Sequence, residues 1–120
     1  MKYLLDTHTL LWLLEGDERL SQRAREIIGD IDQQLFASVA SLWEITIKVS
    51  IGKLKISKGI REVANALTVL DIKTVPVLPQ HLEVLGTLPF HHRDPFDRLI
   101  IAQAKYEQMT IIGKDSAFKE

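Results

Sequence analysis

Hydrophobic residues in this chain fall into two kinds of run that alternate along its length. Short continuous apolar runs favour strands buried on both faces of a sheet. We expect four such strands, at 3–5, 35–37, 72–77 and 109–112. Between them, apolar residues recur at helical spacing. We expect helical segments at 9–15, 20–28, 38–51 or 41–51, 59–70, from 79 onward, and 95–107.

Polar residues at the boundaries of these segments support the division. Ser21 stands where an N-cap residue starts a helix, and Gly29 stands where that helix would stop. Either Ser38 or Ser41 can open the next helix. The stretch from Ser41 to Glu44 matches a capping box, in which Glu44 bonds back to the backbone of Ser41. That role for Glu44 disappears if the helix begins at Ser38.

Short strands separated by helices are typical of an α/β fold with a parallel sheet, because parallel neighbours must be joined by crossover connections. The length of 120 residues and the hydrophobic fraction of 46% are sufficient for one domain with its own core, over residues 1–120. In such sheets ligands bind where the carboxyl ends of the strands meet the following loops. Functional side chains are therefore expected at the strand ends.

The composition excludes several classes of site. The chain has no cysteine, which excludes disulfides, thiolate zinc sites and cysteine nucleophiles. Fifteen Lys and Arg residues face sixteen Asp and Glu residues, so no overall charge excess indicates nucleic acid or a membrane. Asp6, Glu15 and Asp17 interrupt the apolar N-terminal segment well before the roughly 20 residues of a membrane span. We expect a cytoplasmic protein with no membrane partner.

Acidic residues stand near the expected strand ends and helix starts. The five that matter are Asp6, Glu44, Asp94, Asp97 and Asp115. If neighbouring strands lie about 4.8 Å apart, these side chains can converge, and each pair at about 4 Å would repel by roughly 4 kcal/mol. Oxygen ligands without cysteine suit Mg²⁺ or Mn²⁺, which also bind phosphate oxygens. The pattern predicts a divalent metal site for phosphodiester chemistry.

Most of these acids also have a structural explanation. Asp94 followed by Pro95 is typical of an N-cap with proline at the first helical position. The helix dipole would favour Asp97 in the first turn, and Asp115 could be a turn residue. Asp6 is harder to explain, because an acid at the end of a doubly buried strand is desolvated unless something pairs with it. The joint pattern carries the metal-site hypothesis.

Four motifs follow one another along the chain, namely LLDTHTLLW at 4–12, SLWEITIK at 41–48, LPFHHRDPFDRLIIAQA at 88–104 and IIGKDSAF at 111–118. In this order and at this spacing they resemble the PIN-domain ribonucleases of the VapC-like toxin group. The resemblance implies a PIN-like three-layer α/β/α domain with a short-stranded parallel sheet. It also implies a Mg²⁺- or Mn²⁺-dependent endoribonuclease that acts as the toxin of a toxin–antitoxin pair. An RNA substrate, a cognate antitoxin and a homodimer would be its partners.

The resemblance also implies roles for individual residues. The four catalytic, metal-binding acids would be Asp6, Glu44, Asp97 and Asp115. Asp94 would be an auxiliary metal ligand or a helix cap. Thr7 and Thr9 would place hydroxyl groups near the metal or its waters. The residues expected to contact substrate are Thr7, His8, Thr9, Lys48, Lys53 and Arg98, although Arg98 could instead neutralise the acids.

One position departs from the family pattern. The fourth motif often has Thr or Ser two residues before its aspartate, and Gly113 occupies that place here. The chain ends five residues after Asp115, so we expect the final strand to be shortened or absent. Both features favour an alternative in which the protein is a catalytically weak or inactive module that binds RNA or protein.

A basic stretch follows the second motif. Between Glu44 and Glu62 there are five basic residues and no acidic one, namely Lys48, Lys53, Lys55, Lys58 and Arg61. This stretch predicts either a phosphate-binding rim beside the acids or a solvated turn. Trp12 and Trp43 lie in apolar helical stretches, so we expect them to pack against other side chains in preference to stacking on bases. The four histidines are scattered or adjacent, which disfavours a zinc site.

Two other phosphate-handling classes fit the sequence poorly. A phosphatase of the haloacid dehalogenase type would have a second acid two residues after Asp6, where this chain has His8. A phospho-accepting receiver domain would have an aspartate at the end of its third strand, where this chain has Val77 and Pro79.

Overall fold

Four parallel strands form the sheet, and a two-residue strand extends one edge. The computed structural model describes residues 1–89, 94–113 and 118–119. The strands are β1 (Lys2–Leu5), β2 (Gln34–Ser38), β3 (Ile72–Val75), β4 (Thr110–Ile112) and β5 (Phe118–Lys119). Their order is β3-β2-β1-β4-β5, with β5 antiparallel to β4 and the other neighbours parallel. The final strand is therefore present but short, as expected.

Helices connect the parallel strands in pairs. They are α1 (Thr7–Glu15), α2 (Gln22–Ile28), α3 (Val39–Ser50), α4 (Ile60–Val69), α5 (Pro79–Thr87) and α6 (Pro95–Glu107). Two helices follow each of the first three strands, so the predicted α/β class is confirmed. In the described part of the chain, no helix combines the length and apolar character needed to cross a membrane.

The helix starts follow the predicted caps, with one correction. The Ser21 side chain accepts a hydrogen bond from the Ala24 N–H, which confirms it as the N-cap of α2. Ser38 is the N-cap of α3, so the helix begins early and the capping box at Ser41 does not form. Helix α1 starts at Thr7, two residues earlier than predicted. The reason is that Asp6 itself caps this helix.

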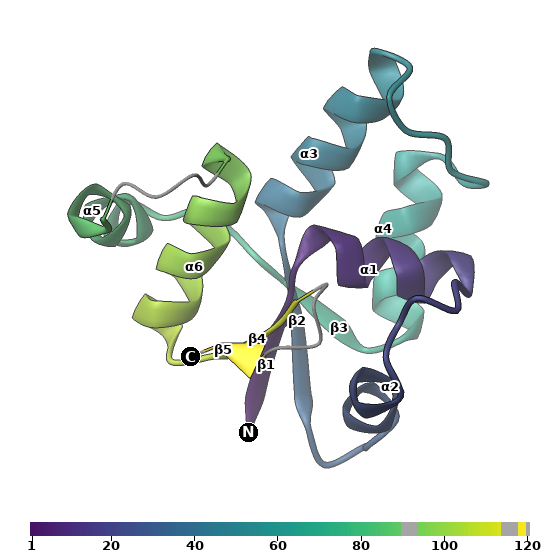
Figure 1. Ribbon diagram of the computed structural model, residues 1–120, viewed down its shortest axis with the longest axis horizontal. Coiled ribbons are helices and arrows are strands. Elements are labelled where there is room, and N and C mark those ends of the chain that lie inside the picture. Colours follow the sequence, from purple (N-terminus) through teal and green to yellow (C-terminus); the bar gives the residue numbers. More distant parts are fainter. Residues whose placement is uncertain (90–93, 114–117, 120) are drawn as a thin grey trace.

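Helices cover both faces of the sheet, giving the predicted three layers (Figure 1). Helices α1 to α4 lie on one face, while α6 lies on the other with α5 packed beside it. Leu4 and Leu5 are adjacent in β1 and point to opposite faces, and both are fully buried. The two layers of core therefore meet at β1, the middle strand.

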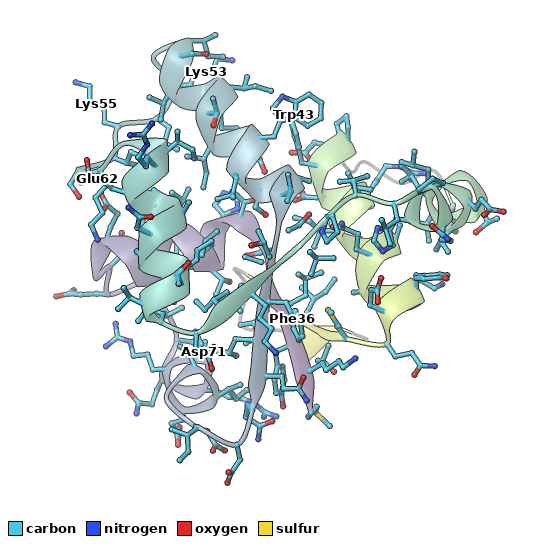
Figure 2. All side chains as sticks on the ribbon, turned by 180° about the vertical axis from the view of Figure 1, so that it is seen from behind. Phe36, Trp43, Lys53, Lys55, Glu62 and Asp71 are labelled. Atoms are coloured by element: carbon cyan, nitrogen blue, oxygen red, sulfur yellow. The ribbon has the colours of Figure 1, made fainter. Side chains whose placement is uncertain are left out.

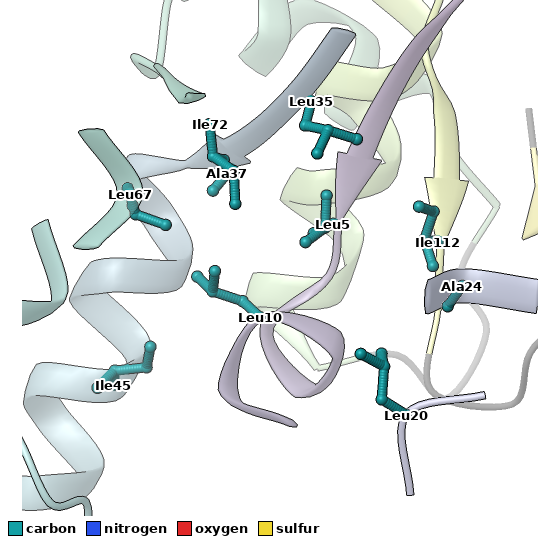
Figure 3. Close-up of a cluster of buried hydrophobic side chains, with 10 residues drawn as sticks. All are labelled: Leu5, Leu10, Leu20, Ala24, Leu35, Ala37, Ile45, Leu67, Ile72 and Ile112. Carbon is teal, nitrogen blue, oxygen red and sulfur yellow. The ribbon is translucent and has the colours of Figure 1, made fainter. Parts of the chain in front are cut away.

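The larger core lies between the sheet and α1 to α4 (Figure 3). Leu5 and Ile112 contribute from neighbouring strands, Leu10 from α1 and Leu67 from α4. Each fully buried side chain of this size contributes about 1.5–3 kcal/mol relative to an exposed one. On the other face, Leu4 packs in a smaller cluster with residues of β4 and α6.

The same packing brings three helix starts to one edge of the sheet. The Asp6 N–H donates to the Ile112 carbonyl oxygen at 3.0 Å, which joins the ends of β1 and β4. The Thr9 hydroxyl donates to the same carbonyl, also at 3.0 Å. Helices α1 and α3 leave from this edge, and α6 begins near it. Candidate functional side chains are expected here.

Candidate active site

Glu44 is a buried carboxylate in the second turn of α3. Only 2% of the surface of Glu44 is exposed to solvent. Thr7 Oγ1 lies 2.8 Å from Glu44 Oε1, and Lys48 Nζ lies 2.7 Å from Glu44 Oε2. Burial of a charge is tolerated only with such partners. The two contacts give each oxygen of this buried carboxylate a partner.

Thr7 links this carboxylate to the first helix. Its Oγ1 also lies 2.9 Å from Ser41 Oγ, and both residues are buried. The Thr7 hydroxyl has a single proton, so when it donates to Glu44 it accepts from Ser41. The three side chains form a short chain of hydrogen bonds between α1 and α3 that orients the Glu44 carboxylate.

Asp6 enters the same region from the end of β1. It is half-buried, and its Oδ1 accepts the Thr9 N–H at 2.8 Å as the N-cap of α1. The partial positive charge at a helix start favours the carboxylate there. Asp6 therefore has a structural role in addition to any metal-binding role.

Asp94 and Asp97 lie at the start of α6. The exposed Asp94 is the N-cap, and its Oδ1 accepts the Asp97 N–H at 2.8 Å. Burial raises the pKa of the half-buried Asp97, and the charges of Asp94, Glu44 and Asp6 raise it further. Carboxylates from three separate elements thus lie close enough to repel one another. The predicted convergence of Asp6, Glu44 and Asp97 agrees with this electrostatic coupling.

Positive groups lie among these acids. The hydrogen bond with Glu44 raises the pKa of Lys48, and the charges of Asp94 and Asp97 add to the effect. His8 has the opposite influence on Asp97 and lowers its pKa. The acidic site is therefore balanced in part by cations of the chain itself.

The oxygen donors present suit Mg²⁺ or Mn²⁺ in kind, since both prefer carboxylate and water oxygens. Within the described residues, no three His, Cys, Asp or Glu side chains form a group that could hold an ion. Thr7 and Lys48 engage both oxygens of Glu44. The residues fit a divalent ion if Glu44 exchanges Lys48 for it. Asp115, the fourth predicted ligand, lies outside the described residues.

A cleft of about 390 Å³ opens beside the acids. Thr7, His8 and Lys48 line its wall on the side of the acidic site. Further cations come from Arg19, Lys53 and Lys55. Lys53 and Lys55 lie near the far end of α3 (Figure 2). Part of the basic stretch in the sequence thus lines a cleft that also includes Thr7 and Lys48, the two side chains bonded to Glu44.

Two of the side chains predicted to contact substrate form hydrogen bonds within the protein. The Arg98 guanidinium donates to the carbonyl oxygens of Pro89 at 2.7 Å and of Leu85 and Leu88 at 3.4 Å. These bonds tie α6 to the end of α5. Thr9 is 1% exposed and its hydroxyl is bonded to β4. Both side chains therefore have structural roles, and their contacts with substrate stay predictions.

The two tryptophans differ in exposure. Trp12 is partly buried against the larger core, as predicted. Trp43 is 59% exposed and packs at the surface. Its ring contacts Phe96 edge to face, with ring centroids 5.1 Å apart.

A family comparison covers nearly the whole chain. The model of the PIN domain matches residues 3–120. The chain belongs to the PIN-domain family. This confirms the resemblance seen in the four motifs. No curated protein sequence gives a significant match.

Solved structures share the PIN fold at low sequence identity. A toxin–antitoxin complex from Klebsiella pneumoniae has a chain with a TM-score of 0.61 and 15% identity, covering 91% of this chain and 82% of that one. VapBC2 from Rickettsia felis, bound to a DNA fragment from its promoter, gives a TM-score of 0.60 and 16% identity, covering 92% and 86%. At this identity the similarity supports the PIN fold.

Proposed function

We propose that this PIN-domain protein is a metal-dependent endoribonuclease. The observation that carries the proposal is the coupling of Asp97 with Asp6 and Glu44 at one edge of the sheet. Such a group of carboxylates repels itself unless cations or protons intervene. Divalent ions relieve the repulsion and bring phosphate chemistry to the site.

Asp6, Glu44 and Asp97 would hold the Mg²⁺ or Mn²⁺, with Asp94 and Asp115 as further predicted ligands. The bound ion would supply Lewis acidity and an activated water for attack on the phosphodiester. The chain itself supplies orientation. Thr7 fixes the Glu44 carboxylate through a 2.8 Å contact. The cap formed by Asp94 fixes the first turn of α6, and with it the backbone of Asp97.

The cleft beside the acids would receive the RNA strand. Lys53 and His8 line it and can contact phosphate or sugar oxygens, while Thr7 lies at the junction with the acids. Lys48 also lines the cleft while it is bonded to Glu44, and its ammonium group has further N–H donors that can join these contacts. Contacts of this kind position a nucleic acid and weaken as salt concentration rises.

The fold comparisons motivate a toxin role as part of this proposal. The two solved structures are toxin–antitoxin complexes by their titles. We propose by analogy that this protein acts in the cytoplasm as a homodimer and is inhibited by a cognate antitoxin. The neighbouring reading frame in the genome tests this role, since it should encode a small DNA-binding protein. A gene without such a neighbour would contradict the toxin role and leave the nuclease activity open.

A catalytically weak binding module is the second candidate. It is favoured by the engagement of both Glu44 oxygens within the chain and by Gly113 in place of a hydroxyl residue. Such a protein would retain RNA affinity without cutting.

The purified protein should be incubated with a structured RNA and Mg²⁺ or Mn²⁺, alongside EDTA and an Asp6→Asn variant. Asparagine also caps helices well, so this variant removes the charge and keeps the start of α1. We expect cleavage only by the wild-type protein with metal. Cleavage that survives EDTA and the substitution would contradict the proposal. RNA binding without cleavage would support the binding module.

A further inference from the structure

The cleft beside the acids contains a side chain held in a fixed orientation that the proposed mechanism does not use. Arg19 makes three side-chain contacts with the Asp17 carboxylate, from Nε at 3.1 and 3.3 Å and from Nη2 at 2.7 Å. Its Cζ lies 5.3 Å from the centroid of the Trp12 ring. The hydrogen bonds from Arg19 lower the pKa of Asp17 to about 2, so this carboxylate stays ionised. The Arg19 guanidinium thus contacts both the Asp17 carboxylate and the Trp12 ring.

Arg19 nevertheless keeps much of its surface in solvent. Its side chain is 71% exposed although it contacts Trp12. A planar guanidinium with an exposed face is a good platform for a nucleobase, because it stacks and carries charge at once. The Asp17 and Trp12 contacts exist before any ligand arrives, so little side-chain entropy remains to be lost on binding.

The opposite wall of the cleft is also held in place. Glu15 at the end of α1 accepts hydrogen bonds from Ser57 N at 3.1 Å and Ser57 Oγ at 2.8 Å. The N–H groups of Lys53 and Leu54 donate to the Lys48 carbonyl at 2.9 and 3.1 Å. These bonds fix the segment that follows α3. Its two cleft lysines are thereby held close to α1.

These lysines are available to an anion. Lys53 and Lys55 are both exposed, and neither forms an ion pair with any described residue. Between them and Arg19 the cleft has apolar walls, contributed by Leu11, Ile45, Leu54 and Ile56. Its volume of about 390 Å³ lies within the roughly 300–1,000 Å³ common for small-ligand sites. A flat base and one phosphate match this combination of size, apolar wall and cationic rim.

We propose that this cleft binds one nucleotide of the RNA strand, with its base stacked on Arg19 and its phosphate held by Lys53 and Lys55. The inference rests on the proposed function and adds a base-recognition pocket to it. His8 lines the cleft and also influences the pKa of Asp97, so the pocket adjoins the acids. The bound nucleotide would therefore be a neighbour of the phosphodiester that is cut.

Trp12 provides the readout for a binding experiment without metal. In a Trp43→Phe background, Trp12 is the remaining tryptophan of the chain. The protein in EDTA is titrated with the four ribonucleoside 5′-monophosphates, inorganic phosphate, hexaglutamate and a trinucleotide RNA. We expect saturable quenching by the monophosphates, with preference among the bases, and tighter binding of the trinucleotide. Inorganic phosphate should bind weakly and leave Trp12 emission nearly unchanged.

Matched variants separate base stacking from charge. Arg19→Lys keeps the charge and loses the plane, so it should weaken monophosphate binding about fivefold or more and remove base preference. Lys53→Met combined with Lys55→Met should weaken binding of every nucleotide and reduce its salt dependence. Lys2→Met removes one charge at the opposite edge of the sheet. It should change neither the affinity for nucleotides nor the salt dependence of binding. Circular dichroism of each variant verifies the fold.

Several results would overturn the nucleotide pocket. One is an Arg19→Lys variant that binds as the parent does. Another is equal binding of hexaglutamate, which would indicate an acidic protein segment as the occupant. Equal affinity for monophosphate and trinucleotide would indicate a free nucleotide in place of an RNA strand. Because the titration needs neither metal nor cleavage, nucleotide binding by a protein that cuts no RNA would overturn only the proposed function.

Discussion

Lys48 Nζ lies 2.7 Å from Glu44 Oε2, so a buried carboxylate of the acidic site is already paired with a cation from its own helix. The pair spans one helical turn, with the acid N-terminal to the base, which is the favourable order. A divalent ion bound by Glu44 would have to replace this ammonium group. The displaced lysine would then face the cleft that it also lines.

Lys48→Met should therefore bind Mn²⁺ more tightly than the wild-type protein, by about three- to tenfold, because the competing cation is gone. The metal-free variant should lose about 1–3 kcal/mol of stability, since one Glu44 oxygen is left without its partner. Calorimetric Mn²⁺ titration and urea unfolding in EDTA measure the two effects. Lys53→Met, which removes an equal charge without touching Glu44, is the control. An equal gain in both variants would contradict direct competition.

Thr7→Val should destabilise the protein by about 1–3 kcal/mol, because Glu44 Oε1 then lacks a donor in a buried place. Valine has nearly the shape of threonine, so packing changes little. Ser41→Ala should cost less, since Thr7 still donates to Glu44. Urea unfolding in EDTA compares the two variants. A larger loss in Ser41→Ala would show that the hydrogen-bond chain runs in the other direction.

Asp97 predicts a pH dependence. Its pKa is raised in the folded protein by burial and by the neighbouring acids. A raised pKa means that the folded state binds the proton more tightly than the unfolded state, so stability falls as pH rises through the folded pKa. Asp97→Asn should therefore be more stable than the wild-type protein at pH 7.5 in EDTA. The difference should vanish below pH 3.8, the ordinary pKa of an aspartate carboxyl group.

Thermal unfolding at several pH values measures the effect of Asp97→Asn. Added Mn²⁺ should make the wild-type protein the more stable of the two at pH 7.5, because only the wild-type site has the charged Asp97 carboxylate to bind the ion. Asp71→Asn, at an exposed position after α4, is a control with the same change in charge. An Asp97 variant that is less stable at every pH would contradict the electrostatic coupling.

His81 lies on α5, away from the acidic site, and should be important for the stability of the protein. It is fully buried, and its Nδ1 accepts the Leu78 N–H at 3.0 Å, so the ring proton sits on Nε2. Nε2 then donates to Glu107 Oε2 at 2.8 Å and ties α5 to α6. His81→Ala should cost about 2–4 kcal/mol through lost packing and lost hydrogen bonds. Glu107→Gln keeps an acceptor and should cost less, as urea unfolding would show.

The helices and strands that were predicted best are marked in the sequence by capping residues or proline at their ends. Ser21 and Asp94 cap their helices as the pattern indicated, and α6 has the predicted bounds. The third strand ends at Val75, before the predicted 77, because Pro76 has no N–H to donate to the ladder. Helix α1 began early because Asp6, interpreted first as a metal ligand, is also an N-cap.

The site was predictable as a set of acids and not as a set of contacts. The carboxyl ends of parallel strands share one edge of the sheet. The sequence could therefore predict that Asp6 and the start of α6 lie near each other. The Thr7–Glu44 contact joins residues 37 positions apart and depends on how α1 packs against α3. No local pattern encodes that packing. The exposure of Trp43 and the Arg19 platform depend on tertiary packing in the same way.

Metal binding by the convergent acids is the central claim, and anomalous diffraction from a crystal soaked in Mn²⁺ tests it most directly. We predict a Mn²⁺ peak coordinated by Asp6, Glu44 and Asp97, with Lys48 moved away from Glu44. A Mn²⁺-soaked crystal with no peak at these carboxylates, and with Lys48 still bonded to Glu44, would contradict the account.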